Sequence, residues 1–296
     1  MLFSVVAQGQ PFSKRVHRIL FLGNSITYEG TYITDLETYF IQKYPQRKIE
    51  FINAGLPSET VSGLSEPNHA DGQFARPDLR ERLARVLAMT KPDLVFACYG
   101  MNDGIYMPFD QGRFDKFREG VNWLHDEVTK TGAEIVHLTP PIYDEANGGS
   151  AGYAAVLDRY SEWLISQRVA ARWKVGDIHF PMKEALTQRR EADASFTFAP
   201  DGIHPGVEGH WVMARAVLSF LGEPQAGAAT SPQATWTITN GDAIYKLVAE
   251  RQKLMKDSWL TATGHKRPGM DKGVPMDEAR KKYATLDKQI RTLLKK

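Results

Sequence analysis

Short apolar runs alternate with amphipathic segments along this chain between residues 18 and 221. The strands expected from the apolar runs cover residues 19–22, 48–52, 93–99, 134–138 and 173–178. The helices expected between and after them cover residues 32–44, 77–89, 114–130, 153–171, 181–190 and 207–221. Strands that alternate with helices form βαβ units, whose parallel sheet is covered by helices on both faces. The sequence therefore predicts an α/β fold around a buried parallel sheet.

The composition argues against several classes of partner. Lys and Arg number 37 and Asp and Glu number 35, so the net charge of +2 gives no electrostatic basis for nucleic-acid binding. The one cysteine, Cys98, excludes an internal disulfide. No apolar run is long enough to span a membrane as a helix. The sequence does not indicate an oligomeric state.

The N-terminal segment, residues 1–17, leaves the compartment open. Residues 2–7 are apolar, and Val5, Val6 and Ala7 are small residues of the kind that precede a signal cleavage site. A basic region is missing, and the apolar run is short for a complete signal peptide. The segment therefore reads either as a signal remnant, which would imply a periplasmic or secreted protein, or as the ordinary N-terminus of a cytoplasmic one.

Polar and glycine-containing turns follow three of the expected strands. Ser25 follows the first strand in the sequence Gly-Asn-Ser-Ile, Gly55 follows the second in Asn-Ala-Gly, and Asn102 follows the third in Gly-Met-Asn-Asp. Ligands bind at the carboxyl ends of the strands in an open parallel sheet. We therefore expect these three residues to lie at one edge of the sheet.

A fourth segment, Asp-Gly-Ile-His, places Asp201 three residues before His204. A serine hydroxyl needs a base to take its proton, and histidine serves as that base near neutral pH. A carboxylate can orient the imidazole, and backbone N–H groups together with an amide side chain can hold an oxyanion. Each segment alone is typical of an ordinary turn or helix cap, but together the four supply the groups that acyl transfer requires.

The order and content of these four segments resemble those of the SGNH (GDSL-like) hydrolases over about residues 18–221. The resemblance implies a three-layer α/β/α, flavodoxin-like sandwich with about five parallel strands, and we assign residues 18–222 to this hydrolase domain. Asn24 departs from the family pattern, because the family most often has Asp at this position.

The resemblance also implies a role for each of the five residues. Ser25 would be the nucleophile, His204 the general base and Asp201 the residue that orients His204. The N–H groups of Ser25 and Gly55 and the side-chain amide of Asn102 would form the oxyanion hole.

We therefore expect a serine ester hydrolase that works through an acyl-serine intermediate, without cofactor or metal. The preferred substrate is a small acyl group, such as acetate, on a carbohydrate or other small molecule, because the polar loop 57–75 suits sugar hydroxyls better than a lipid tail. The histidine in that loop has no spacing typical of a metal site. Candidate substrate-binding residues are Asn24, Glu59, His69, Asp103, His265 and Arg267.

Three alternatives stay open at this point. One is a thioesterase or lysophospholipase that uses the same catalytic residues. Another is a phosphate- or flavin-binding protein of the same fold, with the phosphate at the turn 23–27, although this leaves Asp201 and His204 unexplained. The third is a carbohydrate-binding relative without activity.

The pattern changes after residue 222. Residues 223–235 are rich in Gly, Ala, Ser and Pro and are predicted to be a linker. The amphipathic segments 242–257 and 277–294 predict a C-terminal helical hairpin within residues 236–296. The basic loop 260–275 between the two helices is either a solvated loop or an element that reaches the edge of the active site.

Overall fold

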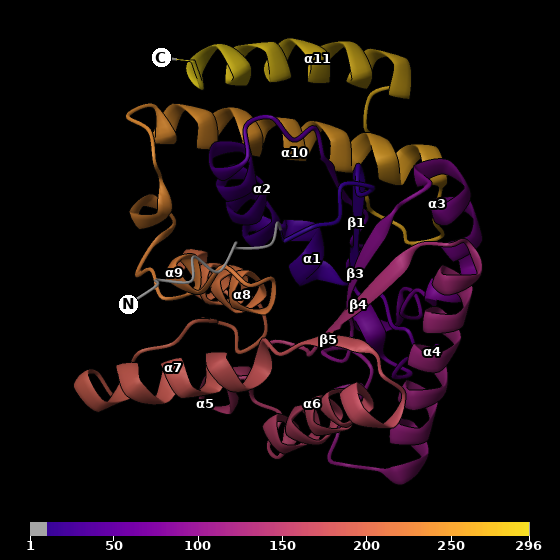
Figure 1. Ribbon diagram of the computed structural model, residues 1–296. Helices are drawn as coiled ribbons and strands as arrows, with labels where there is room; N and C mark the ends of the chain where they lie inside the picture. The colour runs from indigo at the N-terminus through magenta and orange to yellow at the C-terminus, as the bar shows by residue number, and fades with distance from the viewer. Residues whose placement is uncertain (1–10, 296) are drawn as a thin grey trace.

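The computed structural model describes residues 11–295 and has a five-stranded sheet at its centre (Figure 1). Its strands are β1 (Arg18–Gly23), β2 (Glu50–Asn53), β3 (Leu94–Cys98), β4 (Glu134–Leu138) and β5 (Lys174–Gly176). The strand order is β2-β1-β3-β4-β5, and every neighbouring pair is parallel. This order is that of flavodoxin-like folds and confirms the predicted sheet. The signal-like residues 1–10 lie outside the described part of the chain.

The centre of the sheet is apolar throughout. Leu20 of β1 pairs with Ile52 of β2 on one side and with Val95 of β3 on the other. All three side chains are fully buried, as expected for strands covered on both faces. The ring of Phe21 stacks against that of Phe96 at 5.2 Å between ring centres. This packing makes the carboxyl ends of β1, β2 and β3 a rigid edge.

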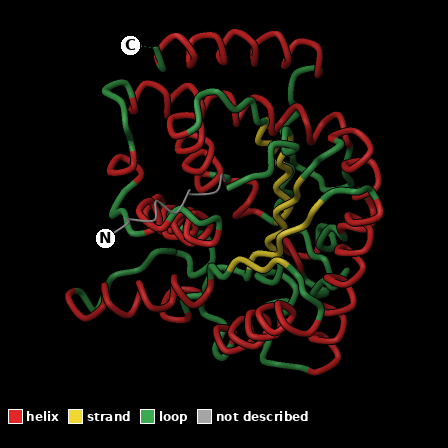
Figure 2. The backbone as a smooth tube through the Cα atoms, in the orientation of Figure 1, coloured by secondary structure: helices red, strands yellow, loops and turns green. Residues whose placement is uncertain are grey.

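Helices cover both faces of this sheet, as Figure 2 shows. In Figure 1, α2 and α8 lie on one side and α3 and α4 on the other, which confirms the three-layer arrangement. The helices up to residue 220 are α1 (Ser25–Glu29), α2 (Thr31–Lys43), α3 (Leu83–Thr90), α4 (Gln111–Lys130), α5 (Glu145–Gly148), α6 (Tyr153–Ala170), α7 (His179–Ala192) and α8 (Val207–Phe220). Two short 3-10 helices, η1 (His69–Gly72) and η2 (Leu79–Glu81), lie within the loop regions. None of the described helices is long and apolar enough to cross a membrane.

Two helices differ from the pattern expected from sequence. The single helix expected over 77–89 is divided into η2 and α3 at Arg82, whose backbone is not helical. Asp78 accepts a hydrogen bond from the N–H of Arg80 at 2.9 Å and thereby starts the 3-10 turn. Helix α7 begins at His179, two residues before the expected start at Pro181. The helix tolerates Pro181 in its first turn, because the N–H that proline lacks would have no partner within the helix there.

The segment 223–235, expected as a linker, is folded against the domain formed by residues 18–222. It contains α9 (Pro224–Gly227) and η3 (Pro232–Thr235), and α9 packs on α8. The buried carboxylate of Glu223 accepts hydrogen bonds from the hydroxyls of Tyr39 and Tyr44 on α2 and at its end.

The last two helices, α10 (Gly241–Thr263) and α11 (Met276–Leu293), lie side by side at the edge of the molecule (Figure 1). Helix α10 contacts α2, α3 and β2 as well as α11. The apolar seams of the two helices include the buried residues Ile244, Val248 and Met255 of α10 and Ala279, Leu286 and Ile290 of α11. Helix α10 therefore packs directly against the domain formed by residues 18–222.

Candidate active site

The turn after β1 places Ser25 at the first position of α1. Asn24 caps this helix, because its Oδ1 accepts a hydrogen bond from the N–H of Ile26 at 3.1 Å. Asn and Asp cap helices about equally well, so Asn24 can cap this turn as the Asp implied by the resemblance would. Asn24 is only 3% exposed, and its Oδ1 is engaged by its own helix, so the structure gives it a capping role.

Three side chains form one continuous chain of hydrogen bonds at this turn. Ser25 Oγ lies 2.8 Å from His204 Nε2, and His204 Nδ1 lies 2.6 Å from Asp201 Oδ2. Asp201 Oδ1 also accepts the backbone N–H groups of Ile203 and His204 at 2.9 and 2.7 Å. If Nδ1 carries the proton and donates it to the carboxylate, Nε2 is free to accept the serine proton. The geometry therefore suits proton transfer from a serine nucleophile.

Asp201 is stabilised as a carboxylate despite its partial burial. Burial alone raises the pKa of a carboxyl group, but the hydrogen bonds from the His204 side chain and from the backbone N–H groups of His204 and Ile203 outweigh it and lower the pKa of Asp201. The side chains of Asp201 and His204 are 53% and 42% exposed, so the site is open to solvent on this side.

The turn after β2 brings Gly55 against α1. A Cβ atom at this position would lie 2.3 Å from the backbone nitrogen of Tyr28, so only glycine permits this approach. The N–H of Gly55 donates to Asn53 Oδ1 at 2.9 Å, and Asn53 Nδ2 donates to the carbonyl of Thr27 at 2.7 Å. Gly55 can therefore join an oxyanion hole only by sharing its N–H with Asn53 or by releasing it.

The amide of Asn102 lies at the end of β3, where two partners fix its orientation. Its Oδ1 accepts the hydroxyl of Tyr106 at 2.9 Å, and its Nδ2 donates to the carbonyl of Glu59 at 3.1 Å. An amide nitrogen has two N–H groups, so the second remains for a ligand. The N–H of Ser25 is likewise available, since the first N–H groups of a helix have no acceptor within it.

Two other predicted substrate-binding residues, Glu59 and Asp103, are buried and cannot contact substrate. Asp103 has no exposed surface, and its carboxylate accepts the backbone N–H groups of Val61 and Ser62 at 2.9 Å and of Gly100 at 2.8 Å. Glu59 also has no exposed surface and forms an ion pair with a buried arginine. Both predictions are wrong, because these carboxylates hold the loop 57–75 to the body of the protein.

The remaining predicted residues lie where the loop 57–75 meets the C-terminal loop. The ring of His69 contacts the ring of Phe74 edge-on at 5.1 Å, and the guanidinium of Arg267 lies 5.2 Å from the centre of the same ring. His265 is half-buried, and burial together with the charge of nearby Arg82 lowers its pKa. The structure thus brings His69 and Arg267 together at one edge.

This edge is connected to Asn102 through Glu66 and through Arg76 and Tyr106, two residues that sequence reasoning missed. His69 Nδ1 lies 3.1 Å from Glu66 Oε1, and Glu66 forms a bidentate ion pair with Arg76 in which both distances are 2.6 Å. The Arg76 guanidinium in turn lies 5.2 Å from the centre of the Tyr106 ring. The φ angle of Tyr106 is +56°, an unfavourable value for a bulky residue and one that no sequence pattern signals. Within residues 11–295, no group of three or more His, Cys, Asp or Glu side chains could hold a metal ion.

Comparison with known proteins places this geometry in context. The model of the GDSL-like Lipase/Acylhydrolase family matches residues 21–212. No curated protein matches the chain in sequence.

Three solved structures have a similar fold. A gut microbial diltiazem-metabolizing enzyme is 24% identical with a TM-score of 0.56, and the match covers 73% of this chain but only 48% of that protein. An alpha/beta hydrolase enzyme from the metagenome of Lake Arreo, Spain, is 22% identical with a TM-score of 0.57, covering 73% of this chain and 99% of that one. An acetylxylan esterase from Geobacillus stearothermophilus is 22% identical with a TM-score of 0.55, covering 70% and 94%.

Proposed function

The chain belongs to the GDSL-like lipase/acylhydrolase family and is an acyl hydrolase, and from this premise we propose that it cleaves esters through an acyl-serine intermediate on Ser25. The observation that carries the proposal is the unbroken chain of hydrogen bonds from Asp201 through His204 to Ser25 Oγ.

The proposed reaction has two halves. In the first, Ser25 Oγ attacks the acyl carbonyl carbon while His204 Nε2 takes the hydroxyl proton, and Asp201 stabilises the imidazolium that forms. The tetrahedral oxyanion is held by the N–H of Ser25 and the amide of Asn102, with Gly55 as a further donor. The intermediate collapses when His204 gives its proton to the leaving oxygen. In the second half, a water molecule activated by His204 releases the acid and restores Ser25.

We further propose that the acyl group is small, such as acetate, and that the leaving group is a carbohydrate hydroxyl. The exposure of His204 and Asp201 supports a bulky leaving group, because it leaves the site open on that side. The edge formed by His69, Phe74 and Arg267 supports a sugar, since it combines polar groups with an aromatic ring. The acetylxylan esterase with a similar fold is a further reason to begin with acetylated sugars.

The test is a comparison of acyl length and leaving group with wild type and Ser25→Ala side by side. The substrates are acetylated xylooligosaccharides, aryl esters of acetate, butyrate and octanoate, and an acyl thioester, and released acid is measured. We expect the highest kcat/KM with acetyl groups on the oligosaccharides and none above background with Ser25→Ala. Preference for the octanoyl ester or for an acyl thioester would instead indicate a lysophospholipase or a thioesterase. Binding of oligosaccharide without turnover would indicate a non-catalytic carbohydrate-binding protein, and bound flavin without esterase activity would indicate a flavin-binding one.

A further inference from the structure

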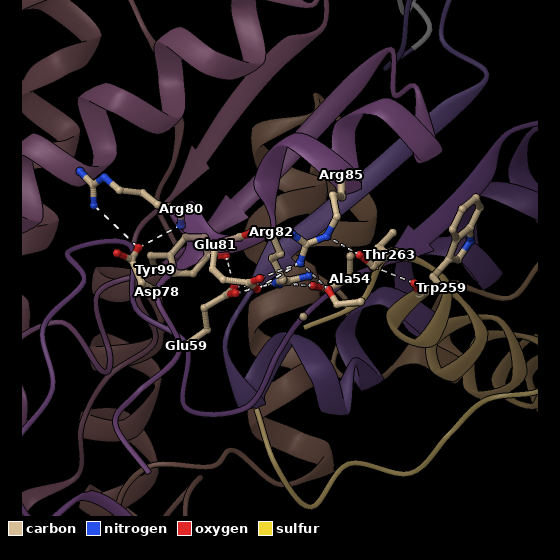
Figure 3. A network of polar contacts seen from close by, with 12 residues as sticks. Ala54, Glu59, Asp78, Arg80, Glu81, Arg82, Arg85, Tyr99, Trp259 and Thr263 are labelled. Carbon is tan, nitrogen blue, oxygen red and sulfur yellow. Dashed lines mark hydrogen bonds and ion pairs between the residues drawn. The ribbon is translucent and has the colours of Figure 1, made fainter. Parts of the chain in front are cut away.

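Glu59 and Arg82 form a buried ion pair, and Figure 3 shows it together with Ala54 and Tyr99. Arg82 Nε lies 2.6 Å from Glu59 Oε1, and Arg82 Nη2 lies 2.8 Å from Glu59 Oε2. The two side chains are 1% and 0% exposed. A buried ion pair rarely adds net stability, because the cost of removing two charges from water is similar to the attraction between them. Stability alone therefore does not explain why Glu59 and Arg82 form an ion pair at this position.

One end of the pair fixes the peptide unit that carries the N–H of Gly55. Arg82 Nη2 donates to the carbonyl oxygen of Ala54 at 2.7 Å. That carbonyl and the Gly55 N–H belong to the same planar trans peptide, in which they point in opposite directions. Any rotation of the Ala54 carbonyl away from Arg82 would turn the Gly55 N–H by the same angle. Arg82 therefore sets the direction of this donor together with Asn53, whose Oδ1 accepts the Gly55 N–H at 2.9 Å.

The other end of the pair fixes the amide of Asn102. The backbone carbonyl of Glu59 accepts a hydrogen bond from Asn102 Nδ2 at 3.1 Å, which leaves the second N–H of that amide in a defined direction. The Glu59 carboxylate is anchored to the same strand end, because Tyr99 donates its hydroxyl to Glu59 Oε2 at 2.7 Å. Tyr99 directly follows β3, and Asn102 is three residues further along the same turn.

We propose that the Glu59–Arg82 ion pair is a positioning device that aligns two oxyanion donors, the Gly55 N–H and the Asn102 amide. The proposal rests on the oxyanion roles given to these residues above. One rigid salt bridge joins the ends of β2 and β3, so the two donors are held in a fixed relation although they come from different strands. Neither Glu59 nor Arg82 touches substrate; both act through the donors that they hold.

The chain supplies a matched control in a second buried ion pair, between Arg251 and Glu37. Arg251 Nη2 lies 2.8 Å from Glu37 Oε1, and the side chains are 3% and 1% exposed. This pair joins α10 to α2, and among the described contacts neither residue bonds to Ser25, Gly55, Asn102 or their partners Ala54 and Asn53. Loss of the Glu59 carboxylate leaves Arg82 without a carboxylate partner, whereas loss of the Glu37 carboxylate leaves Arg251 paired with Asp287 at 2.9 Å; both losses remove a buried ion pair and lower stability. Only loss of the first should alter catalysis.

The experiment compares Glu59→Gln with Glu37→Gln in the full chain, measuring kcat, KM and the melting temperature on an aryl acetate. We expect both variants to melt earlier, while kcat falls roughly 10–10²-fold in Glu59→Gln alone, the scale of a small misplacement of catalytic groups, and KM changes little. Tyr99→Phe removes one bond to the Glu59 carboxylate without removing a charge. It should fold normally and lose a smaller part of kcat.

A double-mutant cycle decides whether the effect passes through the oxyanion donors. If Glu59 acts by positioning, the combined loss in Glu59→Gln with Asn102→Ala is smaller than the product of the separate losses. Equal kcat in Glu59→Gln, Tyr99→Phe and Glu37→Gln, or losses that multiply fully, would overturn the proposal. This outcome differs from a failure of the proposed function. If the proposed function is wrong, Ser25→Ala keeps its activity, whatever the result for Glu59→Gln.

Discussion

His204 Nε2 lies 2.8 Å from Ser25 Oγ, although the two residues are 179 positions apart in the chain. Each is held by its own local turn: Ser25 begins α1 directly after β1, and His204 belongs to the turn in which Asp201 accepts the N–H of His204 at 2.7 Å. The contact therefore depends on the placement of two rigid segments. The predictions below follow from this contact and from the groups around it.

Replacement of Ser25 with alanine should abolish turnover and leave the fold intact. Ser25 is half-buried at the start of a short helix and makes no contribution to the apolar core, so its loss removes the nucleophile alone. We expect a loss in kcat on the order of 10⁶-fold, the scale seen when a serine nucleophile is removed. A phosphonate inhibitor should label wild-type protein once, at Ser25, as read by peptide mass spectrometry. Labelling of the Ser25→Ala variant would contradict the assignment.

The Asn102→Ala substitution should slow the chemical step more than it weakens binding. Removal of one oxyanion donor typically lowers kcat by about 10²–10³-fold. Tyr106→Phe is the matched milder change, since it removes only the hydrogen bond that orients the Asn102 amide, and we expect a smaller loss in kcat. Steady-state kinetics on an aryl acetate separates the effects. A rise in KM with unchanged kcat would make Asn102 a substrate-binding residue instead.

The activity should fall as the pH is lowered, because a protonated imidazole cannot take the serine proton. His204 accepts the serine proton only when its imidazole is neutral, so activity is lost as the pH falls and the ring becomes protonated. Asp201 does not add a second step, because its hydrogen bonds lower its pKa and it stays a carboxylate. Asp201→Asn should lower kcat by roughly 10⁴-fold through loss of the correct imidazole tautomer. A flat kcat/KM profile between pH 5 and 8, with chemistry rate-limiting, would contradict a histidine base.

The Arg267→Ala substitution should show whether the loop 260–275 contributes to substrate binding or is only a solvated surface loop. Arg267 rests on Phe74 at the edge near the site, so we expect a higher KM for acetylated oligosaccharides and unchanged kinetics on a small aryl acetate. Lys272→Ala is the control, because Lys272 is an exposed cation of the same loop. If both variants treat both substrates as wild type does, the loop has no role in substrate binding.

The stability at low pH should depend on Asp158. This carboxylate forms hydrogen bonds with His179 Nε2 at 2.8 Å and Lys183 Nζ at 2.7 Å. These two partners lower its pKa to about 2. Because the pKa of Asp158 is lower in the folded protein than in the unfolded chain, where it is about 3.9, the ionised carboxylate stabilises the folded state at pH values above that. This stabilisation disappears as the pH falls through about 2. Asp158→Asn should therefore cost about 1–2 kcal/mol at neutral pH, allowing for partial solvent screening, and little at pH 2. Denaturant unfolding at both pH values measures the difference.

A matched surface pair provides the control for the Asp158 measurement. Glu119 forms an ion pair with Lys116 at 2.8 Å, but both side chains are more than half exposed. Glu119→Gln should leave the free energy of unfolding unchanged within error, because exposed ion pairs contribute little. A loss for Asp158→Asn that is the same at pH 2 as at pH 7 would show that packing, and not charge, is responsible.

The sequence by itself determined the sheet and the edge at which the site lies. Apolar runs alternating with helical periodicity can bury both faces of a sheet only in a parallel α/β arrangement, and parallel strands end at a common edge. Ser25, Gly55 and Asn102 were therefore assigned to one place from strand ends alone. Asp201 and His204 were predictable as a pair because their contact is local, within a single turn.

The tertiary structure alone decided which polar loop residues are buried and support the fold. Glu59, Asp103 and Arg82 are charged residues in or next to loops, and nothing in their sequence context marks them as fully buried. The partners that permit their burial lie at the ends of other strands or in other loops. The spacing of apolar residues in the sequence indicates which face of a helix or strand is buried, because that face is made of residues of the same segment. The partner of a buried charge depends on how distant segments pack, and that information exists only once the chain has folded.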